Sequence, residues 1–186
     1  MTTAKTLVVL AGLTFGKDYT ATLRAGSSVT GNTSQGDGGG ISNAFDGVVS
    51  LTLESGSVVA GNTASLSGGG ILLSTMTTAT LHAGSVVENN RANQGGGVGN
   101  RGTLLVAGEI RNNRASTGGG LYNVNSGGPA TATLQAGARV TGNTATTVGG
   151  GVYEASGTVT LADAAIVTGN TPNNCRPVGA VPICVD

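Results

Sequence analysis

Tryptophan is absent from this chain of 186 residues, and aromatic residues make up only 3% and charged residues only 10% of it. The nine basic and nine acidic side chains cancel, so there is no basic field that would gather nucleic acid or anionic lipid. No segment is long and apolar enough to insert into a membrane. No segment carries a helical hydrophobic period either, and the 34 glycines argue further against helices.

The chain has instead a repeat that occurs six times. Each unit reads Thr-Leu, a turn of small residues, an apolar pair and then Asn. The leucines are Leu23, Leu53, Leu81, Leu104, Leu134 and Leu161. The asparagines, each nine residues later, are Asn32, Asn62, Asn90, Asn113, Asn143 and Asn170. Gly triplets, each followed by an apolar residue, start at Gly38, Gly68, Gly95, Gly118 and Gly149.

Each unit therefore contains three short β-strand signals: Thr-Leu, the apolar pair, and the segment after the Gly triplet. One unit cannot bury its own apolar face, whereas stacked copies can pair each strand with its equivalent in the next coil. The repeat predicts an all-β parallel β-helix of about six coils, each with three short strands, over residues 1–171. We assign the variation in repeat length to loops between the Gly triplet and the next Thr-Leu.

Alternation along the strands predicts which side chains point into the column. Besides the leucines, we expect inward ladders at Val29, Val59, Val87, Ile110, Val140 and Val167, and at Ile41, Ile71, Val98, Leu121 and Val152. The asparagines fall at a corner, where stacked amides hydrogen-bond to one another. Only Gly or Asn precedes each of them, which predicts a left-handed backbone conformation there.

The N-terminal segment Lys5–Phe15 looks like the apolar core of a signal peptide. However, its Leu13 precedes Leu23 by the same distance as Ile71 precedes Leu81. We therefore interpret the segment as a degenerate coil, in which case the chain is part of a longer protein. A cleavable signal peptide is the alternative.

The C-terminal segment 172–186 breaks the repeat with three prolines and contains Cys175 and Cys184. Two cysteines this close in an otherwise Cys-free chain predict a disulfide-closed cap, with two free thiols as the alternative. A cap is expected because an open column end exposes backbone groups. A disulfide implies an oxidising location outside the cytoplasm. A metal site is not expected, since two thiols and the single His82 do not make a ligand set.

The paired motifs apolar-x-x-Asn and Gly-Gly-small-apolar occur in Val29–Asn32 with Gly38–Ile41, and in Ile110–Asn113 with Gly118–Leu121. They resemble those of the chlamydial polymorphic membrane proteins and related bacterial surface proteins. The tail Gly169–Cys175 is similar to the end of secreted actinobacterial β-helix proteins. The resemblance implies a right-handed parallel β-helix that is secreted or displayed on the cell surface and is often adhesive. This chain has Val or Ile where the surface proteins often have Phe.

Carboxylates that would cleave polysaccharides are not evident. Many parallel β-helices are polysaccharide lyases or hydrolases, which need two or three clustered carboxylates or a calcium site with a base. Asp37, Asp46 and Glu54 lie in neighbouring turns but on different edges of the coil, and no Asp-Asp or Asp-x-Asp pair occurs. We expect a non-enzymatic protein without a cofactor, with a pectin-lyase-like lyase or hydrolase as the alternative.

The middle coils contain the densest polar cluster. On the apolar-pair strand, stacking places Glu88 beside Arg111 and Glu109 beside Arg139. This pattern is typical of cross-strand ion pairs on a solvated face.

Four further residues are candidates for ligand contact. Arg91 and Arg114 follow equivalent asparagines and should stack, which would make them exposed donors for a carboxylate or a sugar. Tyr122 and Tyr153 occupy equivalent outward positions near the variable loops, where they would stack on a sugar ring. Incidental surface aromatics are the alternative.

An outward ladder is expected on the Thr-Leu strands at Thr22, Thr52, Thr80, Thr103, Thr133 and Thr160. A regular Thr ladder on a flat face suggests ice binding. The second rank of that face is expected at Arg24, Glu54, His82, Leu105, Gln135 and Ala162. Such an irregular rank would spoil a repeating match to ice, so ice binding is a minor alternative to Thr as a good strand former.

The best interpretation is an extracellular, non-enzymatic β-helix module for adhesion, spacing or carbohydrate contact, with a glycan or a cell-surface molecule as its partner. The expected binding segments are the variable loops at Ser42–Val49, Leu72–Ala79 and Tyr122–Ala132. Insertions are tolerated there because they do not disturb the stack.

Overall fold

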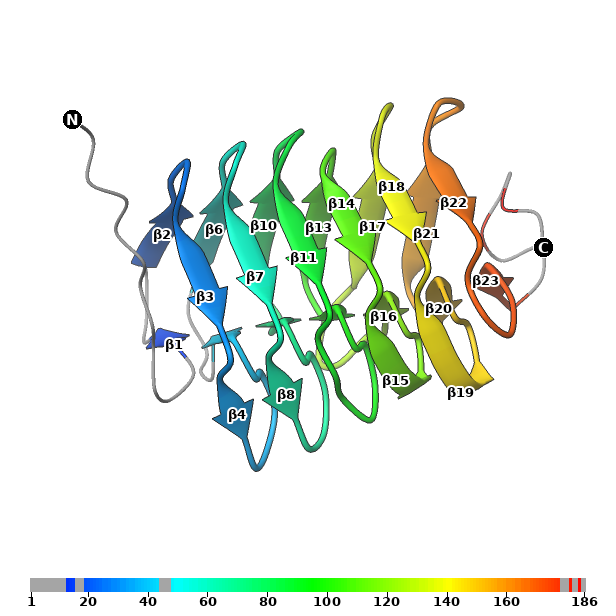
Figure 1. The fold of residues 1–186 in the computed structure, drawn as a ribbon, viewed down its shortest axis with the longest axis horizontal. Coiled ribbons are helices and arrows are strands. Elements are labelled where there is room, and N and C mark those ends of the chain that lie inside the picture. Colours follow the sequence, from blue (N-terminus) through cyan, green and yellow to red (C-terminus); the bar gives the residue numbers. More distant parts are fainter. Residues whose placement is uncertain (1–12, 16–18, 44–47, 178–180, 182–183, 185–186) are drawn as a thin grey trace.

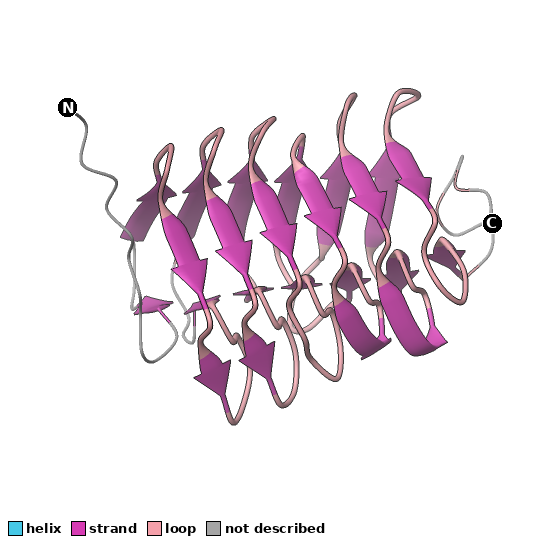
Figure 2. Ribbon diagram, in the orientation of Figure 1, coloured by secondary structure: helices cyan, strands magenta, loops and turns pink. Residues whose placement is uncertain are grey.

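The computed structural model describes residues 13–15, 19–43, 48–177, 181 and 184, and every regular element within them is a β-strand (Figure 2). The chain winds into a column in which equivalent strands of successive coils lie side by side (Figure 1). Each coil passes from a strand behind the column, over the top, to a strand in front as it advances toward the C-terminus, which is a right-handed path. The predicted parallel β-helix is confirmed.

Three parallel sheets run along the column, and we name them by their sequence signals. The Gly sheet, after the Gly triplets, contains β1 (Leu13–Phe15), β5 (Ile41–Asn43), β9 (Ile71–Leu73), β12 (Val98–Asn100), β16 (Leu121–Asn123), β20 (Val152–Glu154) and β23 (Cys175–Arg176). The Thr sheet contains β2 (Tyr19–Leu23), β6 (Val49–Leu53), β10 (Thr77–Leu81), β13 (Thr103–Val106), β17 (Thr131–Leu134) and β21 (Thr158–Leu161). The Val sheet contains β3 (Ser28–Thr30), β7 (Val58–Ala60), β11 (Val86–Glu88), β14 (Glu109–Arg111), β18 (Arg139–Thr141) and β22 (Ile166–Thr168).

Two short ladders beyond the Asn corner were not predicted. In these, β4 (Thr33–Ser34) pairs with β8 (Thr63–Ala64), and β15 (Arg114–Thr117) pairs with β19 (Thr144–Val148). The six strands of the Thr sheet are separated by five steps. The column therefore makes about five complete turns, slightly fewer than the six coils predicted.

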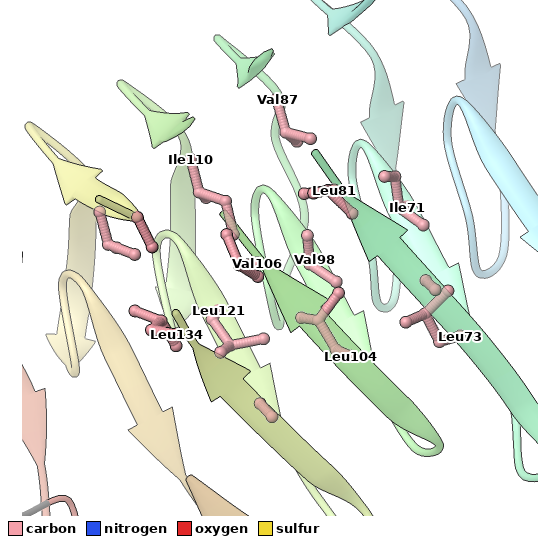
Figure 3. Packing of buried hydrophobic residues seen from close by; sticks show 14 of the residues in the cluster. Ile71, Leu73, Leu81, Val87, Val98, Leu104, Val106, Ile110, Leu121 and Leu134 are labelled. Carbon is pink, nitrogen blue, oxygen red and sulfur yellow. The ribbon is translucent and has the colours of Figure 1, made fainter. Parts of the chain in front are cut away.

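The core lies between the three sheets and is aliphatic. Figure 3 shows side chains such as Leu81, Val87 and Val98 pointing inward from the three sheets. The predicted inward residues are buried, except that Val167 is only partly buried, because β22 is the edge strand of its sheet. Each fully buried Val, Ile or Leu side chain contributes about 1.5–3 kcal/mol to folding.

One predicted alignment is wrong. The pairing of β10 with β13 places Leu81 opposite Val106 and Ala79 opposite Leu104, so Val106 continues the leucine ladder. The turn after β13 has two residues, whereas the turn after β10 has four. Repeat length therefore varies in this turn as well as in the predicted loops. A shift of two residues keeps every side chain on its face, and Leu104 is still fully buried.

At the N-terminal end, β1 pairs with β5 and Leu13 lies opposite Ile41. This part of the predicted degenerate coil therefore occupies the place of a strand that follows a Gly triplet. Residues 5–12, to which the choice between a coil and a signal peptide also applies, lie outside the described residues.

At the C-terminal end, Cys175 and Cys184 form the predicted disulfide, with Cα atoms 6.1 Å apart. Within the predicted cap segment, β23 adds to the Gly sheet with Cys175 opposite Val152. Val181 is buried in the hydrophobic cluster, so the segment places apolar side chains against the last coil. The described part of the chain contains no helix with the length and apolarity needed to cross a membrane.

Candidate functional site

The Asn corner is a continuous chain of amide hydrogen bonds. The backbone N–H and the Nδ2 of Asn90 both donate to Oδ1 of Asn113, at 2.9 and 3.0 Å. The Nδ2 of Asn90 also donates to the carbonyl of Val59 at 3.0 Å, and its Oδ1 accepts two hydrogen bonds from Asn62. The same contacts join the buried side chains of Asn32, Asn62, Asn90, Asn113, Asn143 and Asn170. The corner is therefore structural.

The backbone before each asparagine has the predicted left-handed conformation. All six residues have φ between 55° and 71°, and they include Asn89 and Asn112 as well as four glycines. Asn174 ends the ladder, because its Oδ1 accepts from the N–H and the Nδ2 of Asn170, both at 3.1 Å. The repeat did not reveal this last rung because Asn174 lies four residues from Asn170 and not one coil away.

A second amide ladder, also not predicted, lies where the Gly sheet turns toward the Thr sheet. Nδ2 of Asn100 donates to Oδ1 of Asn123 at 2.7 Å, and both side chains are fully buried. Glu154 lies in register with Asn123, and its Oε2 accepts from the N–H of Val159 at 3.0 Å. Burial raises the pKa of the Glu154 carboxyl, and the Val159 N–H lowers it in part. The sequence does contain a signal for this ladder. In three coils an Asn stands two residues after the apolar residue that follows the Gly triplet, at Asn43, Asn100 and Asn123.

Immediately after the Asn corner, a ladder of solvent-accessible side chains follows the column. Its rungs are Thr33, Thr63, Arg91, Arg114, Thr144 and Thr171. Arg91 and Arg114 are exposed and lie in register, as stacking predicted. Neither takes part in the ion pairs of the described residues. Like charges on adjacent strands repel each other, so this pair is unfavourable for the fold.

The two arginines border a hollow in the surface of about 70 Å³. The lining residues are Arg91, Ala92, Arg114, Ala115, Ser116 and Thr146. Each guanidinium carries five N–H donors that match the geometry of a carboxylate or a sulfate. Pockets that enclose a whole small molecule measure about 300–1,000 Å³. The hollow therefore has the size for a single charged substituent of a larger ligand.

The ion pairs of the middle coils lie on the Val sheet. The Nε of Arg111 donates to Oε2 of Glu88 at 2.9 Å, which is the predicted pair. Glu109 lies in register with Arg139, but its Oε2 is 3.3 Å from Nη1 of Arg111 in its own strand. Half-exposed pairs of this kind contribute at most about 1 kcal/mol.

Tyr122 and Tyr153 lie in register on the Gly sheet, and their rings stack on each other with centroids 5.7 Å apart. The Tyr122 hydroxyl accepts from Nε2 of Gln94 at 3.4 Å. Burial and the neighbouring Tyr153 raise the pKa of Tyr122, and Arg101 lowers it in part. Neither tyrosine lines the hollow. The structure thus brings the two arginines together and the two tyrosines together, but in separate places.

Apart from Glu88 and Glu109, which share Arg111, no two carboxylates of the described residues share an ion-pair partner. Asp37 pairs with Nη1 of Arg101 at 3.2 Å, Glu54 lies in the turn after β6, and Asp46 lies outside the described residues. No three His, Cys, Asp or Glu side chains in the described ranges gather as a metal would require.

The predicted binding loops are shorter than expected, because their ends are strands. The segment between β9 and β10 has only residues 74–76, and that between β16 and β17 has residues 124–130. Residues 44–47 of the first loop lie outside the described residues.

Comparison with protein-family models, with curated proteins and with solved structures finds no match to this chain. The fold is therefore shown by the structure alone, and the resemblance to bacterial surface proteins stays a prediction from the motifs.

Proposed function

We propose that this chain is an extracellular, non-enzymatic β-helix module that contacts acidic glycans through Arg91 and Arg114. The observation that carries the proposal is the pair of exposed, adjacent arginines that border one hollow. The other four rungs of their ladder carry threonine. Two like charges on neighbouring rungs cost stability, and an anion between them would reverse that cost.

The chemistry of the hollow favours a carboxylate or a sulfate. A guanidinium binds such a planar or tetrahedral anion through two parallel N–H bonds. The hydroxyls of Ser116 and Thr146, in the same lining, would contact neighbouring sugar hydroxyls. The size of the hollow supports a polymer that offers one charged substituent at a time. The Cys175–Cys184 disulfide supports a location outside the cytoplasm.

The test is the binding of polygalacturonate and of heparin to the chain, measured by calorimetry at low and at physiological salt, with neutral dextran as the reference. The double variant Arg91→Thr/Arg114→Thr gives both rungs the residue of their neighbours and should fold normally. We expect its affinity for at least one of the two acidic polymers to fall about tenfold or more, because hydrogen bonds to charged groups are worth about 1.5–3 kcal/mol.

The matched control is Arg24→Thr/Arg139→Thr, which removes the same charge at exposed positions away from the hollow. Equal loss of binding in both double variants would mean that only net charge matters, and this result would contradict the proposal. No binding of the unmodified chain to either acidic polymer would also contradict it. Release of reducing ends or unsaturated products during the incubation would favour the pectin-lyase-like alternative.

A further inference from the structure

The outer face of the Thr sheet bears two ladders of short polar side chains, interrupted only at Leu105, whereas one such ladder was predicted. Strand pairing forms a first rank of Thr20, Ser50, Thr78, Thr103, Thr131 and Thr158. It forms a second rank of Thr22, Thr52, Thr80, Leu105, Thr133 and Thr160. Ten of these twelve positions are threonine, one is serine and one is leucine.

The structure differs from the predicted arrangement of this face in two ways. The rank beside the predicted Thr ladder is formed by the residue two positions before each outer Thr, and not by the residue after each leucine. The predicted second-rank residues Arg24, Glu54 and His82 lie in the turns that follow the strands. Thr103 belongs to the first rank, opposite Thr78, and Leu105 takes its place opposite Thr80. The irregularity that argued against ice binding is therefore reduced to one residue, Leu105.

The two ranks form a lattice that repeats in both directions. Neighbouring strands of a sheet lie about 4.8 Å apart, and alternate residues of a parallel strand lie about 6.6 Å apart. None of the twelve side chains is buried, so no other described segment covers the face. In Figure 1 the strands that carry it, from β2 to β21, lie side by side along the column. The β-branched threonines have few rotamers, and at one place two neighbouring hydroxyls contact each other, since Oγ1 of Thr131 donates to Oγ1 of Thr103 at 3.4 Å.

The chemistry of this lattice differs from that of the outer side of the Val sheet. The twelve positions contain no charged and no aromatic residue, whereas the Val sheet carries Glu88, Glu109 and Arg111 on its outer side. A single soluble glycan chain repeats in one direction only and would leave one rank unused. A crystalline polysaccharide also repeats in two directions, but the apolar faces of its sugar rings would find no aromatic side chain to stack on at these twelve positions. A ligand that is neutral, hydroxyl-rich and ordered in two directions matches the lattice best.

We propose that the outer face of the Thr sheet binds ice. Threonine hydroxyls hold first-shell waters at nearly the enthalpy of a direct hydrogen bond. Because the hydroxyls repeat in two directions, the waters bound to them repeat as well, and such a layer joins the surface of an ice crystal without rearrangement of the protein. This inference rests on a different face from the Arg91–Arg114 hollow and is independent of it.

The test is partitioning of the purified chain into slowly growing ice, together with inhibition of ice recrystallisation. We expect the unmodified chain to enter the ice and to keep the crystals small. Thr80→Tyr/Thr133→Tyr should abolish both effects, since two large rings would lift the face away from a flat crystal. Tyr is a good strand former, so the unfolding temperature should change little.

Two further variants separate this inference from general effects of the fold. Thr30→Tyr/Thr141→Tyr introduces the same rings on the Val sheet and should leave ice binding intact. Leu105→Thr completes the second rank and should strengthen the inhibition of recrystallisation. Exclusion of the unmodified chain from ice would overturn the proposal, as would equal losses in the two Tyr double variants. The Arg91→Thr/Arg114→Thr variant, which should lose glycan binding, should still enter ice and inhibit recrystallisation.

Discussion

Two ladders that are adjacent in sequence behave in opposite ways. The ladder at the Asn corner, called the inner ladder below, carries Asn in every coil, and its amides are buried and fully hydrogen-bonded. The solvent-accessible ladder one residue further along, called the outer ladder, carries Thr in four coils and Arg in the two middle coils. The inner residue is constant because each amide is the partner of the next. The outer residue has no such partner and can therefore vary from coil to coil.

The largest effect is expected when one rung of the inner ladder is removed. Asn113→Ala deletes the acceptor of the Asn90 N–H and Nδ2 and the donor to the carbonyl of Val87. Since an orphaned buried polar group costs about 1–3 kcal/mol, the free energy of unfolding should fall by about 3 kcal/mol or more. Urea unfolding followed by circular dichroism measures the change.

The neighbouring substitution Arg114→Thr serves as the control for the outer ladder. It should leave the free energy of unfolding within about 0.5 kcal/mol of the unmodified chain, as is usual for surface changes. Similar losses for Asn113→Ala and Arg114→Thr would show that the two ladders do not differ in the way described.

A slightly smaller effect is expected at the Gly triplet that faces the Asn corner. A Cβ at Gly96 would lie 2.5 Å from the carbonyl oxygen of Arg114 and 2.6 Å from that of Gly119. Both contacts are with backbone, which cannot move aside within the stack, so Gly96→Ala should destabilise the chain by about 1–3 kcal/mol. Gly36, in contrast, has no atom within 4 Å of such a Cβ. Gly36→Ala should therefore be nearly neutral in the same unfolding assay, and comparable losses at the two positions would refute the steric explanation.

The smallest effect concerns Glu154, the charged end of the second amide ladder. Because burial raises its pKa above the ordinary value of 4.5, the folded chain holds this proton to a higher pH than the unfolded chain. The stability that this provides is present below pH 4.5 and is lost as the pH rises through the raised pKa. The unfolding temperature of Glu154→Gln minus that of the unmodified chain should therefore be larger at pH 7 than at pH 4. An unfolding-temperature difference that is the same at both pH values would contradict this account.

The sequence was sufficient to predict the stack, its inward ladders and the left-handed corner before each Asn. These features follow from side-chain period and backbone sterics, which act within a few residues. The predicted alignment of β13 was wrong. The spacing from Leu104 to Asn113 equals the Leu-to-Asn spacing of the other coils, but the turn after β13 is two residues shorter than theirs, so that Val106 takes the place of the leucine. A shift of two residues exchanges Leu104 with Val106 without moving any side chain to the other face, so the hydrophobic pattern could not reveal it.

The candidate sites were predictable only in part for the same reason. Arg91 and Arg114 stand at fixed distances from the Asn corner, so their stacking could be predicted. The hollow beside them could not, because it depends on Ser116 and on Thr146 of the next coil. The mutual stacking of Tyr122 and Tyr153 depends in the same way on the rotamers of two side chains in different coils.

By itself, the amino-acid sequence determined that equivalent residues of successive coils lie one above another, since period, glycine and asparagine leave the backbone little choice. Only the tertiary structure decided which residues are equivalent across coils of unequal length, and hence that a second rank of threonines adjoins the first. The reason is that hydrogen bonds between coils set the register, and they join residues far apart in the chain, such as Asn90 with Asn113, 23 positions away, and with Val59, 31 positions away.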